Sequence, residues 1–471
     1  MKPTPGSATR FSRVARSAME TEMTNAIPLQ QPRPGTDIKP IKIGLLGLGV
    51  VGGGTWSVLS RNAEEIARRA GRRIEVSRVA VRDVTKARSR VGDTVEVGTD
   101  VHALVRDPEV DIVVELIGGD TLARELVLEA IAHGKHVVTA NKALLAKHGN
   151  EIFAAASAQG VMVAFEAAVA GGIPIIKAIR EGLTANRIEW VAGIINGTTN
   201  FILSEMRTRG LPFAEVLAEA QRLGYAEADP TFDVEGVDAA HKLTLLASLA
   251  FGVPVQFDKA YIEGISQLAQ EDIAHAERLG FRIKLLGITK RRTDGIELRV
   301  HPALVPAERL LANVEGAMNA VLVRGDAVGP TLYYGQGAGE EPTASAVVAD
   351  LVDVTRLHTA DPGNRVPHLA FQPDAMSDLA ILPIDKISTS YYLRLRVDDQ
   401  PGVLADIARE LAERGISIGS MIQQPSHIGG ADIIFLTHQA VEGNVDQAIR
   451  SIEQLPFVRS SVTRLRVETL A

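Results

Sequence analysis

A short apolar strand runs directly into a glycine-rich turn near the start of the chain, at Ile41-Lys42-Ile43-Gly44-Leu45-Leu46-Gly47-Leu48-Gly49-Val50-Val51-Gly52. A helical pattern follows as far as about Ala70. Strand, G-x-G-x-x-G and helix in this order are the setting in which dinucleotide-binding turns occur. The six residues from Gly47 to Gly52, including Leu48, Gly49, Val50 and Val51, are therefore predicted to bind a dinucleotide. A plain flexible turn is the alternative.

Strands and helices continue to alternate after this turn. Further apolar strands are predicted at Arg73–Val81, Asp111–Ile117, His136–Ala140 and Val161–Phe165. This alternation favours a Rossmann-type parallel sheet, in which polar residues at the carboxyl ends of strands face the cofactor crevice. Gly118 and Lys142 follow two of these strands and are predicted to lie there.

Arg82 follows the second strand, with Lys86 nearby. A guanidinium at this position can pair with the 2′-phosphate of NADP. The neighbouring Asp83 could instead accept a hydrogen bond from the ribose hydroxyl of NAD. The sequence favours NADP and leaves NAD open.

Composition excludes several functions. The net charge of −7 offers no basic surface for nucleic acid. The most apolar stretch, near residues 161–179, contains Glu166 and Lys177, so no membrane span is expected. The chain has no cysteine, which rules out disulfides, thiolate metal sites and cysteine nucleophiles.

Longer motifs follow in order: Thr139-Ala140-Asn141-Lys142, Phe165-Glu166-Ala167-Ala168-Val169-Ala170-Gly171-Gly172-Ile173-Pro174-Ile175-Ile176, Asn196-Gly197-Thr198-Thr199-Asn200 and the acidic stretch from Gly224 to Lys242. Over about residues 40–360 they resemble homoserine dehydrogenase. The resemblance implies reversible, NAD(P)H-dependent reduction of L-aspartate 4-semialdehyde to L-homoserine, in threonine, methionine and isoleucine biosynthesis.

The acidic stretch carries the implied catalytic residues. Asp238 and Lys242 are four residues apart, so they share one face of a helix that begins near Asp238. The resemblance implies that Lys242 donates and accepts the proton at the substrate hydroxyl, that Asp238 orients the substrate, and that Lys142 is a second cation. It also implies that Gly224 and Glu227 bind the substrate, Glu227 through the amino group. An ordinary helix ion pair is the alternative for Asp238 and Lys242.

The other acidic residues of this stretch have no implied role. Asp233 and Glu235 are expected to stay solvated. His241 matches no catalytic motif.

Two further segments acquire roles from the resemblance. A sodium ion is implied at Glu166, Val169, Gly171 and Ile173, held largely by backbone carbonyls, and oxygen ligands suit such a hard cation. A structural turn that caps the helix starting near Pro174 is the alternative. The segment from Gly335 to Ala346 resembles the family segment that returns to the cofactor. Its Gly339 is predicted to lie beside the cofactor.

The C-terminal region has the order β-α-β-β-α-β, with strands predicted at Tyr391–Val397, Ile416–Gln423, Ala431–His438 and Ser461–Val467. It resembles an ACT domain, a regulatory module that binds amino acids. Gly402 and Val403, after Pro401, are predicted to offer backbone amides to an effector carboxylate, and threonine is the expected effector. A dimerisation module without an effector is the alternative.

The predicted fold is α/β in three parts: a Rossmann-type nucleotide domain, an α+β substrate and dimerisation domain, and a ferredoxin-like ACT domain. The predicted boundaries are 1–38 for a disordered tail, 39–166 for the nucleotide domain with a return at about 335–360, 167–334 for the substrate domain, 361–388 for a linker and 389–471 for the ACT domain. A cytoplasmic homodimer or homotetramer is expected.

Three other functions fit the sequence less well. Aspartate-semialdehyde dehydrogenase needs a cysteine nucleophile, and this chain has no cysteine. Phosphoglycerate dehydrogenase also ends in an ACT domain, but it places the G-x-G-x-x-G in mid-chain and uses a catalytic histidine. An inactive amino-acid sensor would have no reason to keep Lys142, Glu227 and Lys242 together, and a cofactor-oxidation assay distinguishes it from an enzyme.

Overall fold

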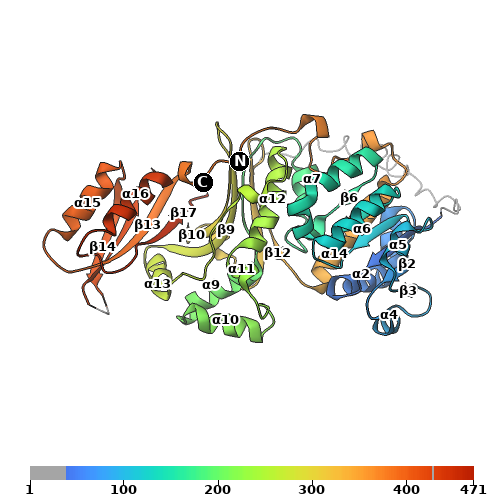
Figure 1. Cartoon of the computed structure of the whole chain (residues 1–471), viewed down its shortest axis with the longest axis horizontal. Coiled ribbons are helices and arrows are strands. Elements are labelled where there is room, and N and C mark those ends of the chain that lie inside the picture. The colour runs from blue at the N-terminus through green and yellow to red at the C-terminus, as the bar shows by residue number, and fades with distance from the viewer. Residues whose placement is uncertain (1–38, 427–428, 471) are drawn as a thin grey trace, which may run out of the picture. The chain divides into compact units, whose positions relative to one another are not determined.

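A computed structural model describes residues 39–426 and 429–470 of the chain (Figure 1). The predicted tail at 1–38 lies outside the described residues. Within the described parts, we find no helix with the length and apolar content that a bilayer crossing requires.

The N-terminal part is a six-stranded sheet in which every pairing is parallel, with the order β3-β2-β1-β4-β5-β6. Its strands are β1 (Ile41–Leu46), β2 (Ile74–Ala80), β3 (Glu96–Gly98), β4 (Ile112–Glu115), β5 (His136–Thr139) and β6 (Val163–Ala164). Its helices are α2 (Val50–Arg61), α3 (Ala63–Ala70), α4 (Val84–Val91), α5 (Val101–Arg106), α6 (Thr121–Ala132) and α7 (Lys142–Gln159). The Rossmann-type sheet is confirmed, and the strand order reverses between β1 and β4, where such sheets bind nucleotides.

A distant segment completes this part of the fold. Helix α14 (Glu340–Leu357) packs against α2, which carries three consecutive glycines at 52–54. A Cβ on Gly54 would lie 2.6 Å from the carbonyl oxygen of Glu340, so the two helices need a glycine at this contact. Arg61 and Glu341 form an ion pair across the same contact. The return predicted for about 335–360 is thus a helix that covers α2.

The middle of the chain forms a second sheet with helices packed against it. The strands are β7 (Ile188–Ile194), β8 (Tyr261–Ile262), β9 (Phe281–Arg291), β10 (Ile296–Pro306), β11 (Met318–Gly325) and β12 (Gly329–Gln336). The helices are α8 (Ile175–Lys177), α9 (Gly197–Arg209), α10 (Phe213–Arg222), α11 (Thr231–Val234), α12 (Val237–Phe251) and α13 (Gln270–Arg278).

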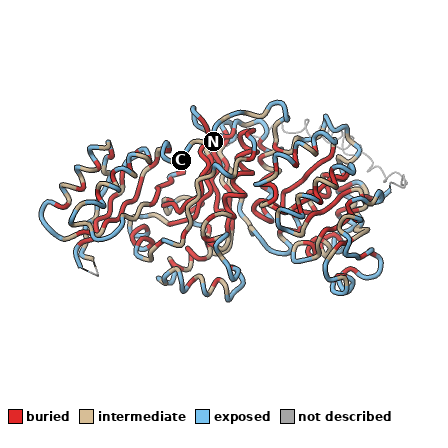
Figure 2. The backbone as a smooth tube through the Cα atoms, viewed as in Figure 1, coloured by how far each residue is buried: buried red, intermediate tan, exposed pale blue. Residues whose placement is uncertain are grey.

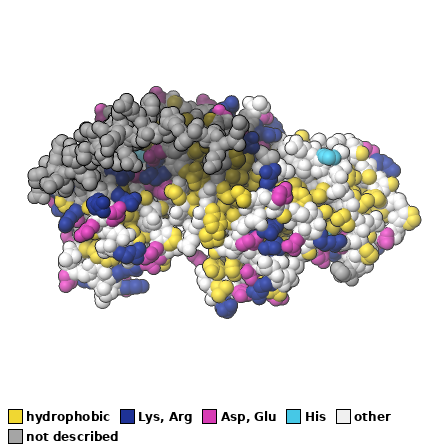
Figure 3. All heavy atoms as spheres, turned by 180° about the vertical axis from the view of Figure 1, so that it is seen from behind, with side chains coloured by type: hydrophobic (Ala, Val, Ile, Leu, Met, Phe, Trp, Pro, Cys, Tyr) yellow, Lys and Arg dark blue, Asp and Glu magenta, His cyan; other side chains and the backbone are white. Residues whose placement is uncertain are grey.

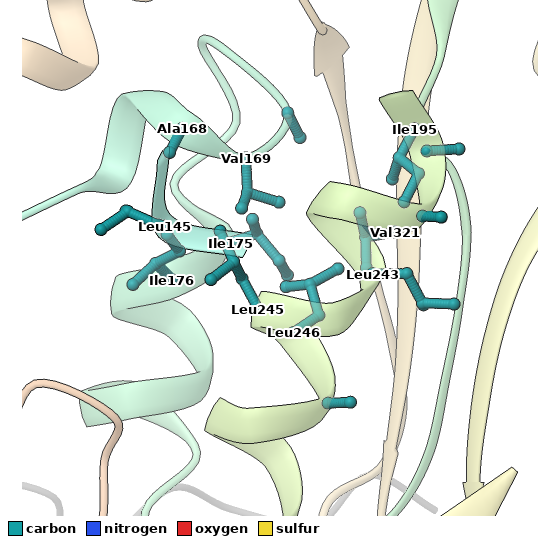
Figure 4. Packing of buried hydrophobic residues seen from close by; sticks show 14 of the residues in the cluster. Leu145, Ala168, Val169, Ile175, Ile176, Ile195, Leu243, Leu245, Leu246 and Val321 are labelled. Carbon is teal, nitrogen blue, oxygen red and sulfur yellow. The ribbon is translucent and has the colours of Figure 1, made fainter. Parts of the chain in front are cut away.

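Helix α12 lies at the centre of the fold, because all its residues from Asp238 to Phe251 are buried. Figure 4 shows its leucines between two groups of apolar side chains. Leu145, Ile175 and Ile176 lie on one side of the helix, and Ile195 and Val321 lie on the side of the second sheet. Burial on all sides fixes the position of the helix, and therefore of the polar residues in its first turns.

The C-terminal region has the predicted β-α-β-β-α-β order. Its main elements are β13 (Ser388–Val397), α15 (Val403–Glu413), β14 (Ile418–Pro425), β15 (Ala431–Thr437), α16 (Glu442–Ile452) and β17 (Thr463–Val467), with a short β16 (Ala440–Val441) paired to β13. The four longer strands lie in the order β17-β13-β15-β14.

This module is not a separate sheet. Strand β17 pairs in parallel with β10, so the second sheet continues through the module as eleven strands. Figure 2 shows buried backbone along the strands of this sheet. Arg299 of β10 is fully buried at the junction and donates to Glu468 over 2.6 Å. The predicted linker also packs on the body: Ile381 bridges to Ile296, and Phe371 contacts Gly252.

Candidate active site

The glycine-rich turn has the geometry that a dinucleotide requires. Gly47 has φ +94°, and a Cβ there would lie 2.9 Å from the carbonyl oxygen of Leu116. A Cβ on Gly52 would overlap the carbonyl oxygen of Gly47, so helix and turn need a glycine at this contact. Gly49 has open space around it and immediately precedes α2. The amides at the start of α2 can therefore receive a phosphate.

A cavity of about 620 Å³ extends from this turn to the ends of β2 and β4. Arg82, Lys86 and Arg90 line it, so three cationic side chains are available for a phosphate. Asp83 also lines the cavity, but its carboxylate caps α4 by accepting the N–H of Lys86 over 2.9 Å. Arg90 was not predicted as a site residue from the sequence, although it lies four residues after Lys86, which places both side chains on one face of α4.

A second cavity of about 300 Å³ adjoins the first, since Leu116 and Gly118 line both. Its other lining residues are Val51, Glu115, Gly119, Ala140, Asn141, Lys142, Ala143 and Phe232. Lys142 opens α7, and its side chain is one-third exposed.

Asp238 joins two lysines from different parts of the fold. Its Oδ2 accepts a hydrogen bond from Lys242 Nζ over 2.7 Å, one helical turn along α12. Its Oδ1 lies 3.0 Å from Lys142 Nζ at the start of α7. The predicted shared face of Asp238 and Lys242 is confirmed, and Lys142 completes a cluster of one carboxylate and two ammonium groups.

Burial and charge act against each other in this cluster. Burial alone would raise the pKa of Asp238, but the ammonium groups of Lys242 and Lys142 outweigh it and hold the pKa well below its usual value. Burial lowers the pKa of Lys242, and the Asp238 carboxylate opposes that shift. Lys242 also donates to the carbonyl oxygen of Ile195 over 2.7 Å. Its ammonium is therefore fixed in position and releases its proton more readily than an ordinary lysine.

Two neighbours of Asp238, Asn196 and Asp233, had no role assigned to their side chains from the sequence. Asn196 caps α9 through its side-chain oxygen, while its Nδ2 donates to Asp238 over 2.8 Å and to Asp233 over 2.7 Å. The expectation that Asp233 and Glu235 stay solvated is wrong, because both are half-buried. Burial also raises the pKa of Asp233. Asn196 belongs to one of the motifs that carry the family resemblance, but only the fold brings its amide to these carboxylates.

His241 lies next to Lys242 on α12 and is buried. Its ring lies edge-on to Phe257 and Phe232. Burial lowers its pKa to about 4, so the ring is neutral near pH 7. It packs among aromatic rings, as a core residue does.

The predicted substrate-binding residues lie in the loop after α10. Gly224 has φ +77° and follows the last turn of that helix, so its conformation alone calls for glycine. Glu227 is exposed, and its backbone carbonyl accepts a hydrogen bond from Gln221. The structure does not bring the Glu227 carboxylate into the Asp238 cluster, so its role in binding stays a prediction.

The region of the implied sodium site is a buried turn. Oε1 and Oε2 of Glu166 accept the N–H groups of Ile176 and Lys177 over 2.8 and 2.9 Å. The carboxylate thus caps α8, as the structural alternative expects. Burial raises the pKa of Glu166 to about 7. The implied ion ligands at Val169, Gly171 and Ile173 stay a prediction.

The two remaining glycines of the predicted sites both precede helices. Gly339 immediately precedes α14. The carbonyl of Gly337 lies against Gly171, so the returning segment contacts the turn that follows Glu166. Gly402 has φ +95° and precedes α15, whose first residue is Val403. The amides of Gly402 and Val403 therefore lie at a helix start, as the predicted contact with an effector carboxylate requires.

Three family models match the chain. One described as homoserine dehydrogenase, NAD binding domain, matches residues 47–166; one described as homoserine dehydrogenase matches 174–352; and an ACT domain matches 391–457. A homoserine dehydrogenase of Pseudomonas aeruginosa is 63% identical over 92% of this chain and 100% of its own length.

Solved structures give the same result. The crystal structure of a homoserine dehydrogenase from Thiobacillus denitrificans is 68% identical, with a TM-score of 0.89, and the match covers 92% of this chain and 99% of that one. A hyperthermophilic archaeal homoserine dehydrogenase in complex with NADPH is 25% identical, with a TM-score of 0.59, over 69% of this chain and 99% of its own.

Proposed function

This chain belongs to the homoserine dehydrogenase family, and we propose that Lys242, Asp238 and Lys142 form its catalytic centre for reducing L-aspartate 4-semialdehyde. The observation that carries the proposal is the Asp238 carboxylate, which lies between the two ammonium groups beside the cofactor crevice. Family membership makes the protein an oxidoreductase that acts on a CH–OH group with NAD(P).

The residues divide the chemistry between them. The bound nicotinamide cofactor supplies the hydride. As the aldehyde oxygen becomes an alkoxide, the ammonium of Lys242 stabilises the negative charge and delivers a proton. Asp238 holds that ammonium in place, and Lys142 adds a second positive charge at the cavity wall. Homoserine oxidation follows the reverse path, with neutral Lys242 accepting the proton.

Substrate recognition rests on the loop after α10. Glu227 is the proposed partner of the substrate ammonium, and Gly224 shapes the turn that presents it. The exposure of Glu227 leaves its carboxylate accessible to a small cationic group.

We favour NADP as the cofactor. Arg82, Lys86 and Arg90 line the cavity at the end of β2, and a guanidinium can hold a 2′-phosphate with two hydrogen bonds. Asp83 supports the same preference, because its carboxylate already caps α4. The archaeal relative solved with NADPH shows that this family includes NADPH-binding members.

A sodium ion is proposed at the turn formed by Glu166, Val169, Gly171 and Ile173. Ala170 and Gly171 both have left-handed backbone conformations, which turn successive carbonyl groups in different directions. The carbonyls of Glu166 and Ile173 each accept one backbone hydrogen bond and keep a second lone pair. Activity and melting temperature should both be higher in sodium chloride than in choline chloride at equal ionic strength; equal values would remove the ion from the proposal.

Threonine is the proposed effector of the ACT module, with its carboxylate at the amides of Gly402 and Val403. A continuous set of contacts supports control of the active site from this module. Arg466 of β17 is fully buried and donates to Glu263 over 2.8 Å, and its guanidinium lies 4.9 Å from the centre of the Tyr261 ring.

The contacts then continue to the catalytic helix. Gly264 packs so closely on Glu235 that a Cβ would lie 2.6 Å from the Glu235 Cα. Gly236 follows Glu235 in the chain and immediately precedes α12, which carries Asp238 and Lys242. A shift of β17 can therefore reach the first turn of the catalytic helix through packed backbone.

Subunit pairing through the second sheet is proposed from the family resemblance. Hydrophobic side chains gather in the middle of the face shown in Figure 3. Strand β12 ends the sheet, with Tyr334 58% exposed. Sedimentation analysis of the pure protein distinguishes a homodimer or homotetramer from a monomer. The cytoplasmic location stays a prediction from the sequence.

The activity itself is tested by mixing pure protein with aspartate 4-semialdehyde and NADPH or NADH and following cofactor absorbance. We expect reduction with both cofactors and a higher kcat/KM with NADPH. A folded protein that oxidises neither cofactor would be an amino-acid sensor and would overturn the catalytic assignment.

A further inference from the structure

The side chain of Glu115 occupies the junction between the two cavities. It is the last residue of β4 and is fully buried. Its register partners are Leu46 of β1 and Thr139 of β5, so it sits where the strand order reverses. Nothing in the proposed chemistry uses this carboxyl group, yet it lines the cavity that also contains Lys142.

Glu115 holds the turn between the cavities. Its Oε1 accepts the N–H groups of Ile117 and Gly118 over 3.0 and 3.1 Å. Gly118 and Gly119 follow with φ values of +71° and +73°, so this turn depends on left-handed backbone. The turn lines both cavities, and its position sets the wall against which a nicotinamide ring would lie.

The other oxygen holds the turn that carries Lys142. Oε2 of Glu115 accepts the hydroxyl proton of Thr139 over 2.6 Å, and Thr139 Oγ1 accepts the N–H of Asn141 over 3.0 Å. Asn141 then caps α7 by accepting the N–H of Leu144, and its Nδ2 donates to the carbonyl of Gly119 over 2.6 Å. Lys142 is the first residue of the helix capped in this way.

These bonds form a closed circuit of carboxylate, hydroxyl, amide and glycine turn. We propose that Glu115 is a positioning residue, which acts through Thr139 and Asn141 to fix the glycine turn and Lys142 relative to each other. A carboxylate suits this role because it accepts from three donors at once, two on one oxygen and one on the other. The proposal rests on the catalytic role of Lys142 given above.

The relative position of the glycine turn and Lys142 affects the rate of the chemical step. Hydride and proton must arrive at adjacent atoms of the carbonyl group, so a displacement of about 1 Å between the two turns is costly, on the order of 10²-fold. The side chains of Glu115, Thr139 and Asn141 are buried, so a bond lost among them leaves a buried polar group unsatisfied.

The test uses Thr139→Val and Glu115→Gln in the full chain. Valine matches threonine in shape but removes the hydroxyl that links Glu115 to Asn141. Glutamine keeps one acceptor oxygen and replaces the other with a donor. Thr289→Val is the matched control, because Thr289 is also fully buried in a strand and donates to a backbone carbonyl of β10.

We expect both site variants to lose about 10–100-fold in kcat per folded enzyme, with the KM for aspartate 4-semialdehyde little changed. Hydride transfer should become rate-limiting, so the isotope effect on kcat with 4-deuterated NADPH should rise. The double variant should lose little more than the worse single variant, because both substitutions break the same circuit. Thr289→Val should lower the melting temperature without changing kcat or the isotope effect.

A purely structural role predicts another outcome. Thr139→Val would then behave like Thr289→Val, with reduced stability and unchanged kcat per folded enzyme and isotope effect, and this would overturn the proposal. If Glu115→Gln fails to fold, Thr139→Val decides alone. Wild-type protein that oxidises no cofactor would instead show that the catalytic assignment has failed.

Discussion

Lys142 Nζ lies 3.0 Å from Asp238 Oδ1, although the two residues lie in the first turns of helices from different parts of the fold. The nucleotide-binding part supplies Lys142, and the helix at the centre of the fold supplies Asp238. Their contact places a charged cluster beside the cofactor crevice.

Lys242→Met should fold but lose about 10²–10⁴-fold in turnover, because the developing alkoxide loses both its cation and its proton source. Methionine keeps much of the aliphatic length, so packing along α12 should survive. Steady-state kinetics with aspartate 4-semialdehyde and NADPH measure the loss. Lys135→Met is the control: Lys135 is also buried, but it precedes β5 at the amino end of the sheet and donates to the backbone carbonyls of Asp107 and Val110. Near wild-type turnover in Lys242→Met would refute the role of the lysine.

The pH profiles of the two reaction directions should differ in sign. Reduction needs protonated Lys242 and should fall as pH rises through its pKa, whereas homoserine oxidation needs the neutral amine and should fall as pH drops. Asp238 raises the pKa of Lys242, so Asp238→Asn should shift both limbs to lower pH. The log of kcat/KM against pH measures the shift. Asp229→Asn is the control, because Asp229 lies in the exposed loop between α10 and α11; it should leave both limbs in place.

Glu227→Gln should raise the KM for aspartate 4-semialdehyde with little change in kcat. The proposed partner of Glu227 is the substrate ammonium, and a charged hydrogen bond contributes about 1.5–3 kcal/mol, or roughly 10- to 100-fold in binding. Glu215→Gln on α10 is a control at a nearby surface carboxylate. An unchanged KM would mean that another group binds the amine.

Arg82→Ala should weaken NADPH more than NADH. The guanidinium is proposed to hold the 2′-phosphate, which NADH lacks, so the KM for NADPH should rise by about tenfold or more. Comparing kcat/KM for the two cofactors measures the preference. Arg88→Ala provides a control, because Arg88 lies on α4, which follows Arg82, but does not line the cavity. Equal losses for NADPH and NADH would show that Arg82 does not distinguish the phosphate.

Threonine at millimolar concentration should inhibit the full-length enzyme, and Glu263→Gln should reduce that inhibition while activity without threonine persists. The variant weakens the contact between Arg466 of β17 and the segment at Glu263 and Gly264, which packs on Glu235 just before α12. A coupling free energy of about 1–3 kcal/mol would change the inhibition several-fold or more. Dose–response curves and threonine binding by calorimetry separate lost coupling from lost binding.

Glu271→Gln is the control for this contact. Glu271 also pairs with an ACT-module arginine, Arg396, but it lies on α13 rather than on the path to α12. Inhibition equally weakened in both variants would contradict the proposed path, and no response to threonine in wild-type protein would leave the module as a dimerisation element or the receptor of another ligand. Point variants serve better than truncation, because removing the chain from β13 onward would leave Asp272 without Tyr392 and Arg394 and would take Glu468 from Arg299.

Local spacing in the sequence determined the parts of this protein that lie within a few residues of one another. The turn at Gly47–Gly52 and the shared helix face of Asp238 and Lys242 follow from backbone sterics and the 3.6-residue period, which need no knowledge of the rest of the chain. The alternation of strands and helices predicted both the parallel sheet and the order of the ACT module.

Tertiary packing decided which of these local features meet. Lys142 reaches Asp238 because α7 and α12 pack together, and Asn196 reaches both Asp233 and Asp238 because α9 starts beside α12. Burial beside the amides of α8 made the Glu166 carboxylate a helix cap, while the ion at the neighbouring backbone carbonyls stays a prediction. Glu115 carried no sequence signal, since a strand-end carboxylate gains its partners only when β5 pairs alongside β4. A buried polar group takes whichever donors the fold places within hydrogen-bond reach, and no local pattern encodes that choice.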